Sequence, residues 1–303
     1  MEVMTATAEE EVIRFERSVA TPDLRMSGYA SMVPEYYRLV GDIYREMWGP
    51  SGHFSFYRPG QDREAATEAT ERFVADQAGI TSGMRVLDVC SGGGGPALTI
   101  AAYTGAHVTG VDLVPGRVRD AREAAGSRGL TELVSFVVGD VMTLPFPDHS
   151  FDAAFSFDAL THVPDPLRVH REVARVLKPG AAWTGTDWFQ SERPSEQAVL
   201  DIIEPICQTH GLSRMCRLTE YEHNLPAAGF TDVRVCDGRQ LGDWEPNWAL
   251  LEELVAAAPL ESLPPVHRMM ARGARALCEG ARSGDFLVGH WRARMPKHGS
   301  AAR

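Results

Sequence analysis

The feature that most constrains the fold is an alternation of short apolar runs and helical patterns over residues 85–189. The apolar runs are RVLDV, HVTGVDL, VSFVVGD, SFDAAFSFD and AAWTGTDWF. Helical patterns such as GRVRDAREAAGSRG and PLRVHREVARVL stand between them. Strands that are separated by helices pair in parallel through right-handed crossovers. The sequence therefore predicts an α/β fold with a doubly wound, Rossmann-like sheet.

The segments on either side of this core predict helical additions and two further strands. PEYYRLVGDIYREMWG has apolar residues at helical spacing, which predicts a helical cap over residues 1–60. Residues 61–303 form the α/β domain in this interpretation, and a helical lid is expected at about 191–228, before the sixth strand. TDVRVCD and FLVGHWRARMP complete a seven-stranded sheet, with a long helical stretch from about Asn247 to Gly280 between them.

Composition excludes several classes of protein. The 303 residues carry a net charge of −11, which argues against binding of a nucleic-acid backbone. No apolar run reaches the ~20 residues that cross a bilayer, so no membrane insertion is expected. The start, MEVMTATAEEEVIRFERS, is acidic where a signal peptide is basic and then apolar, so we expect a cytoplasmic protein. The five cysteines show no CxxC pair, and no metal site is indicated.

The glycine loop CSGGGGPA follows the first strand and implies a ligand that approaches the backbone closely. One interpretation is the pyrophosphate of a dinucleotide, held at a helix N-terminus. Asp88 argues against it, because a fixed carboxylate four residues before Gly92 repels a phosphate and attracts an amine.

Two further carboxylates describe the rest of the ligand. Asp112 ends the second strand about twenty residues past the glycines, where a carboxylate accepts hydrogen bonds from both hydroxyls of a ribose. Asp140 follows the third strand and suits the exocyclic amine of an adenine. An amine, an unphosphorylated ribose and an adenine together describe S-adenosylmethionine. A nicotinamide-dependent oxidoreductase, and a protein that binds S-adenosylmethionine without methyl transfer, are the alternatives.

The same residues resemble the motifs of class I S-adenosylmethionine-dependent methyltransferases. VLDVCSGGGG, GVDL, VVGDV and FDAAFSFDAL match the first four motifs of that family over residues 81–189. WGPSGHFSFY, FDALTHVPDP and SGDFLVGHWRARMPK are similar to a small-molecule group within it. That group includes sarcosine and dimethylglycine N-methyltransferases, sterol C-methyltransferases and natural-product sugar O-methyltransferases.

The resemblance implies transfer of a methyl group to a nitrogen, oxygen or carbon of a small molecule, in specialised metabolism. The glycine loop is expected to pass under the methionine part of the cofactor. The implied cofactor contacts are Asp88, Cys90, Gly92, Gly94, Asp112, Leu113, Asp140, Val141 and Phe157. Cys90 is not interpreted as a nucleophile, and a buried structural cysteine is its alternative.

Three residues are candidates for the chemistry. His162 lies just beyond the fourth strand, at the edge of the sheet where open α/β folds bind ligands. Asp158 lies four residues earlier and would orient His162 if the segment were helical. Asp187, at the end of the fifth strand, reaches the same edge. Methyl transfer needs a base only when the acceptor atom carries a proton, so a loop histidine and strand-end caps are the alternatives.

The sequence alone does not identify the molecule that accepts the methyl group. Tyr29, His53 and Trp188 are expected to contact it, and Tyr29 is also placed to reach the cofactor. The aromatic cap, with Tyr36 and Tyr37, is expected to close over the cofactor and to exclude water from its sulfonium. The alternative is a helix face packed on the core or on a second copy of the chain, since homodimers are common. Arginines in the lid would suit a carboxylate, and its apolar residues would suit an apolar acceptor; these are Arg193, Arg214 and Arg217, and Ile202, Ile203, Ile206, Leu212 and Met215.

Overall fold

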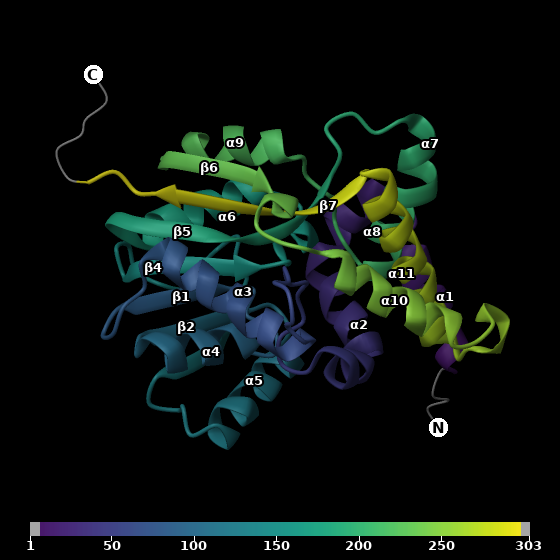
Figure 1. Ribbon diagram of the computed structural model, residues 1–303, viewed down its shortest axis with the longest axis horizontal. Coiled ribbons are helices and arrows are strands. Elements are labelled where there is room, and N and C mark those ends of the chain that lie inside the picture. The colour runs from purple at the N-terminus through teal and green to yellow at the C-terminus, as the bar shows by residue number, and fades with distance from the viewer. Residues whose placement is uncertain (1–6, 298–303) are drawn as a thin grey trace, which may run out of the picture.

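A computed structural model describes residues 7–297 and contains a seven-stranded sheet in the order β3-β2-β1-β4-β5-β7-β6 (Figure 1). The strands are β1 (Arg85–Val89), β2 (His107–Asp112), β3 (Val134–Val138), β4 (Phe151–Phe157), β5 (Leu177–Gln190), β6 (Thr231–Asp237) and β7 (Phe286–Arg294). Strands β1 to β5 pair in parallel, and β7 runs antiparallel to both β5 and β6. The predicted seven-stranded Rossmann-like sheet is confirmed.

Some helices cover the two faces of the sheet, and others lie beyond the carboxyl ends of its parallel strands. They are α1 (Ala8–Ser18), α2 (Pro22–Trp48), α3 (Arg63–Ala78), α4 (Gly95–Thr104), α5 (Pro115–Ser127), α6 (Pro166–Val176), α7 (Glu196–Ala198), α8 (Glu204–His210), α9 (Leu218–Ala227), α10 (Glu245–Ala256) and α11 (Pro265–Ser283). One apolar cluster joins the sheet to α3, α4 and α5, and a second joins it to α6, α9 and the N-terminal helices. Each sheet face is therefore buried, as a parallel sheet requires.

Helices α1, α2, α8, α10 and α11 gather beyond the carboxyl ends of the parallel strands (Figure 1). Local sequence explains where the N-terminal pair begins. Thr7 and Glu10 form a capping box for α1, and Thr21 with Pro22 begins α2. This helical group therefore faces the edge where the sheet presents its strand-end carboxylates.

The helical stretch predicted from about Asn247 to Gly280 is helical, but it is not continuous. Two helices, α10 and α11, stand there instead, separated by a short 3₁₀ turn at Leu260–Ser262. Pro259 and Pro264 flank that turn, and a proline removes a backbone donor and clashes with the preceding helical turn. Within residues 7–297, no helix is long and apolar enough to cross a membrane.

Candidate active site

A first cavity lies at the carboxyl edge of the parallel strands and encloses about 720 Å³, part of it open to solvent. It is lined by Tyr29, Val33, Tyr37, Pro50, Gly52, His53, Asp88, Cys90, Ser91, Gly92, Gly93, Pro96, Asp112, Leu113, Arg117, Val141, Phe157, Asp158, Ala159, His162 and Val163. Most of the predicted cofactor contacts are among these residues, and they come from the ends of four strands, β1 to β4. Helix α2 supplies a further part of the lining. We call this first cavity the cofactor cavity.

Asp88 carries an unsatisfied carboxylate into this cavity. Its side chain is 2% exposed, and its Oδ2 atom has no hydrogen-bond partner within the described part of the chain. Burial, together with the nearby carboxylates of Asp112 and Glu71, raises the pKa of Asp88 well above its usual value. Without a ligand, Asp88 therefore favours its neutral, protonated form, and an ammonium group is the ligand that would stabilise its carboxylate. The aminoacyl end of S-adenosylmethionine fits that requirement.

Asp112 is held in place by the backbone of its neighbours. Its Oδ2 accepts a hydrogen bond from the Gly92 amide at 2.8 Å, and its Oδ1 accepts one from the Val114 amide at 2.8 Å. Burial raises the pKa of Asp112, while these two bonds act in the opposite direction. Each carboxylate oxygen has a second lone pair, so the fixed group can still accept from two ribose hydroxyls.

Gly94 lies outside the cofactor cavity, in contrast to its predicted cofactor contact. Its φ is +83°, and a Cβ atom there would lie 2.7 Å from Phe136 Cζ and 2.9 Å from Ala121 Cβ. Gly92 does line the cavity, and a Cβ there would lie 2.9 Å from the Arg117 guanidinium. The absence of a side chain at Gly94 therefore serves the packing of the protein against itself.

Two of the four non-glycine residues with a positive φ in the described part of the chain line the cofactor cavity. Cys90 and Asp158 have φ values of +64° and +45°, in the left-handed region that residues other than glycine rarely adopt. Such strain is typical of functional sites, where the surrounding structure enforces it. Burial raises the pKa of the Cys90 thiol well above its usual value, so Cys90 faces the cavity as a neutral thiol.

The predicted adenine end of the cavity differs in detail from the sequence interpretation. Val141 and Leu113 line it, but Asp140 does not, and its Oδ1 accepts a hydrogen bond from the Met142 amide at 2.8 Å. Tyr29, predicted to contact the acceptor, lines this cavity instead and lies beside Asp140. Helix α2 therefore contributes to the cofactor cavity, in agreement with the expectation that the aromatic cap lies over the cofactor.

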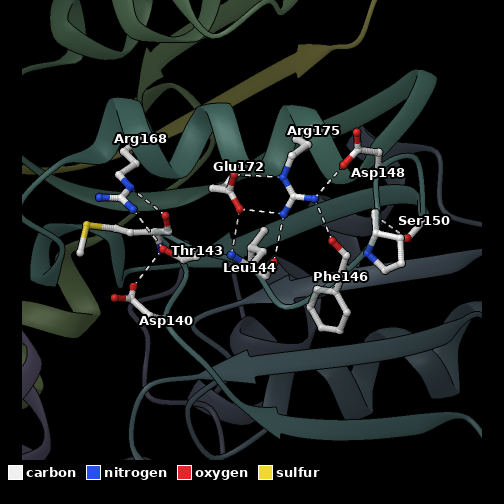
Figure 2. Close-up of polar contacts among 11 residues, drawn as sticks. Asp140, Thr143, Leu144, Phe146, Asp148, Ser150, Arg168, Glu172 and Arg175 are labelled. Atoms are coloured by element: carbon white, nitrogen blue, oxygen red, sulfur yellow. Dashed lines mark hydrogen bonds and ion pairs between the residues drawn. The ribbon is translucent and has the colours of Figure 1, made fainter.

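Side chains of α6 form hydrogen bonds with the backbone of the loop after β3 (Figure 2). Arg168 donates to the Met142 carbonyl at 2.9 Å. Glu172 accepts from the Leu144 amide at 2.9 Å, and Arg175 donates to the Leu144 carbonyl at 3.0 Å. Charge-assisted bonds of this kind fix the start of the loop, where the predicted adenine contacts lie.

His162 lines the cofactor cavity but does not pair with Asp158. Its Nδ1 donates to the Gly211 carbonyl at 2.9 Å, which leaves Nε2 to accept from the Tyr37 hydroxyl at 3.2 Å. Asp158 instead accepts from the Phe54 amide at 2.9 Å and from the hydroxyl of Thr186 on β5 at 2.7 Å. The two residues do not share a helical face, because the positive φ of Asp158 ends regular structure before the short 3₁₀ turn that contains His162.

We expect His162 to stay neutral throughout the physiological pH range. Burial lowers its pKa to about 4, and both of its ring nitrogens already have partners. NMR titration of ring-labelled protein, with His162→Asn to assign the resonance, measures this directly. Protonation of His162 near pH 6.5 would contradict the assignment and restore it as a general base.

Asp187 lines neither the cofactor cavity nor the second cavity, which is described below. Its Oδ2 accepts from the Tyr221 hydroxyl at 2.7 Å, and its Oδ1 accepts from the Trp188 amide at 2.9 Å. Burial is the main reason that its pKa is raised to about 7. Asp187 therefore joins the end of β5 to α9, and its contacts are those of a strand-end cap.

A second cavity adjoins the first and encloses about 850 Å³, part of it open to solvent. It is lined by Ile43, Tyr44, Met47, Trp48, Gly52, His53, Phe54, Trp188, His210, Leu251, Leu254, Val255, Leu263, His267, Met270, Ala271, Ala274 and Leu277. Gly52 and His53 line both cavities. Among the described residues, no Asp, Glu, Lys or Arg lines this second one, which we call the acceptor cavity.

The walls of the acceptor cavity include the predicted contacts His53 and Trp188, but much of the lining comes from α10 and α11, which sequence reasoning did not select. Helices α2, α10 and α11 supply most of the lining, and the segment 191–228 supplies only His210. The apolar residues proposed there, Ile202, Ile203, Ile206, Leu212 and Met215, pack in or against the core, and none of the three candidate arginines lines the cavity. Trp188 does reach it, and its ring stacks on Phe54 with centroids 5.3 Å apart.

Arg117 and Glu71 are two residues of the site that sequence reasoning missed. Arg117 lies 5.0 Å above the Tyr37 ring and is the cation beside Asp112 in the cofactor cavity. Its place three residues into the helix after β2 is a signal that could have been used. Glu71 lies on α3, in a segment with no motif, and its contacts depend wholly on tertiary packing.

Comparison with known proteins identifies the family. Residues 87–183 match the family model described as a methyltransferase domain. Sterol 24-C-methyltransferase ERG6B of Gibberella zeae is 34% identical over 273 residues, which cover 87% of this chain and 68% of that protein. The 24-methylenesterol C-methyltransferase 2 of Oryza sativa subsp. japonica is 31% identical over 294 residues, which cover 91% and 81%. ERG6A of Gibberella zeae is 37% identical, and the aligned part spans only 61% of its length.

Solved structures show the same fold. The [4+2]-cyclase SpnF superposes with a TM-score of 0.72 and 29% identity, covering 88% of this chain and 97% of that one. Geranyl diphosphate C-methyltransferase from Streptomyces coelicolor A3(2), solved with S-adenosyl-L-homocysteine, gives a TM-score of 0.66 at 17% identity, covering 88% and 97%. The chain belongs to the S-adenosylmethionine-dependent small-molecule methyltransferases, and S-adenosylmethionine is its cofactor.

Proposed function

We propose that this methyltransferase acts on a large apolar acceptor and transfers the methyl group to a carbon atom. The observation that carries the proposal is the acceptor cavity, whose lining is aliphatic and aromatic and contains no acidic or basic side chain other than histidine. A carboxylated or phosphorylated acceptor would lack a cationic partner there. The relatives named above for sterol C-methylation support the same class of acceptor.

The aromatic rings of the acceptor cavity suit an acceptor that becomes cationic. When bound, S-adenosylmethionine supplies an electrophilic methyl group, and an alkene that forms a bond to it is left with a positive charge on the neighbouring carbon. Phe54 lies between Trp48 and Trp188, with centroid distances of 5.5 Å and 5.3 Å. The faces of such rings stabilise a nearby cation, and their bulk excludes water that would add to it.

Asp158 is the residue that we propose accepts the proton that the cationic acceptor then loses. It lines the cofactor cavity, accepts from the Phe54 amide and lies beside the Trp188 indole, so it stands at the boundary of the two cavities. Burial raises its pKa, while the nearby His53 lowers it. Loss of this proton restores the alkene, and the carboxylate becomes a carboxylic acid.

An acceptor screen with methyl-labelled S-adenosylmethionine tests the proposal. The purified protein is offered amines, sugars or phenols, and alkene-bearing apolar compounds of the sterol and terpenoid type, with release of S-adenosylhomocysteine as the readout. We expect label in the apolar class alone, and none with a matched Asp158→Asn variant that still binds cofactor. Label only in amines or sugars would refute the carbon acceptor, and silence in every class despite cofactor binding would favour a role without transfer.

The remaining expectations stay predictions. A place in specialised metabolism, a cytoplasmic location and the absence of nucleic-acid partners belong to this group. Self-association through the N-terminal helices is another; Ile13, Leu24 and Met26 leave apolar surface exposed on α1 and α2. The mass of the purified protein in solution measures it, and a monomer at all concentrations would exclude it.

A further inference from the structure

Residues 50–54 form a loop that covers both cavities. Pro50, Gly52 and His53 line the cofactor cavity, while Gly52, His53 and Phe54 line the acceptor cavity. The Pro50 carbonyl accepts from the Gly95 amide at 3.2 Å, which joins the loop to the start of α4. The position of this loop therefore determines how completely a bound cofactor is enclosed.

The carboxylate of Glu71 contacts the side chains of two residues of the loop, Ser51 and His53. Glu71 lies on α3, and its side chain is 1% exposed. Its Oε1 accepts from the Ser51 hydroxyl at 2.6 Å and lies 3.1 Å from His53 Nε2. Because α3 packs on α4 and on the sheet, Glu71 is a fixed point against which the loop is held.

The partners of His53 favour its charged form. Its Nδ1 lies 2.8 Å from the Phe54 carbonyl oxygen, and its Nε2 faces the Glu71 carboxylate. When Glu71 is a carboxylate, both partners are acceptors, so both ring nitrogens carry a proton and the imidazole is a cation. Two carboxylates face it, Glu71 from α3 and Asp158 from the end of β4, and Asp88 of β1 lies beside Glu71. Burial lowers the pKa of His53, but its bond to Glu71 and these charges raise it overall.

We propose that Glu71 is a positioning residue that holds loop 50–54 closed over the bound cofactor, acting through His53 and Ser51. The proposal concerns cofactor binding and does not depend on the class of acceptor. It follows that breaking the bond between Glu71 and His53 accelerates cofactor release. The bond is present while His53 is protonated and is lost as the pH rises through its raised pKa.

The test is the rate at which S-adenosylhomocysteine leaves the purified full chain. Stopped-flow tryptophan fluorescence can follow it, because Trp48 lies against Phe54 at the end of the loop. We expect Glu71→Gln, which keeps the shape and removes the charge, to accelerate dissociation about tenfold at pH 7, since a hydrogen bond between charged groups is weakened. The wild-type rate should rise with pH, and the rate of Glu71→Gln should be fast throughout.

The matched control is Glu68→Gln, one turn earlier on the same helix, where the side chain is exposed and pairs with Arg72. It should keep the wild-type rate and the wild-type pH dependence. Ser51→Ala removes the hydrogen bond from loop 50–54 to Glu71 without changing α3, and it should accelerate dissociation less than Glu71→Gln does. This variant tests the proposal if Glu71→Gln does not fold. Wild-type rates in folded Glu71→Gln, or equal acceleration by Glu68→Gln, would overturn the proposal.

Discussion

Replacing Asp88 by asparagine is expected to weaken S-adenosylmethionine binding by about 100-fold, which corresponds to the loss of a buried charge-assisted hydrogen bond. The reason is the unpartnered Oδ2 atom in the cofactor cavity, which a bound ammonium group would satisfy. An asparagine amide carries no charge and orients a donor as well as an acceptor toward the ligand. Isothermal titration calorimetry of both proteins measures the difference.

The same substitution should make the ligand-free protein more stable at neutral pH. The pKa of Asp88 is raised in the folded state, so the folded protein holds a proton that the unfolded chain releases. Stability conferred by that proton is present at low pH and declines as the pH rises above 3.8, the ordinary value for the unfolded group. Asp88→Asn removes this decline, and the gain in stability should disappear toward acid pH.

Asp76→Asn, an exposed position on α3, is the matched control and should change neither property. Thermal melts at several pH values, with and without cofactor, separate the two effects. Wild-type affinity in a folded Asp88→Asn protein would remove Asp88 from the cofactor site. A loss of affinity accompanied by a loss of stability would instead indicate a structural role.

The cofactor half of the site could largely be predicted, because residues close together in the sequence, at the ends of predicted strands, indicate it. Asp88 and Asp112 end consecutive strands, and the parallel topology that follows from the alternation of strands and helices brings strand ends to one edge. Gly94 shows the limit of this reasoning. A glycine in a glycine-rich loop predicts ligand contact, yet its neighbours Phe136 and Ala121 come from other elements and explain it by packing.

Of the acceptor half, the sequence predicted only His53 and Trp188, because most of the walls come from segments far apart in the sequence. Ile43 of α2 and Leu277 of α11 face one cavity, and each reads from sequence as an ordinary apolar residue of an amphipathic helix. Asp158 and His162 illustrate a second reason. A spacing of four residues predicts a pair only where the backbone is helical, and the positive φ of Asp158 prevents this.

Filling the acceptor cavity is expected to abolish turnover while leaving the cofactor bound. Ala274 of α11 lines this cavity and does not line the cofactor cavity. A phenylalanine there would place a ring where the proposed acceptor lies, and a displacement of about 1 Å from the methyl group is enough to reduce transfer about 100-fold. The rate of methyl transfer to an acceptor identified in the screen, and the affinity for S-adenosylhomocysteine, are the two measurements.

Ala257→Phe is the matched control, because it adds the same ring at the exposed end of α10, outside both cavities. It should keep the wild-type transfer rate. If Ala274→Phe transfers methyl groups at the wild-type rate, the acceptor binds elsewhere and the proposal of an apolar carbon acceptor loses its main support. If cofactor affinity falls together with transfer, the two cavities are coupled through His53, which lines both of them. The contact between Glu71 and His53 would then be the first interaction to test for that coupling.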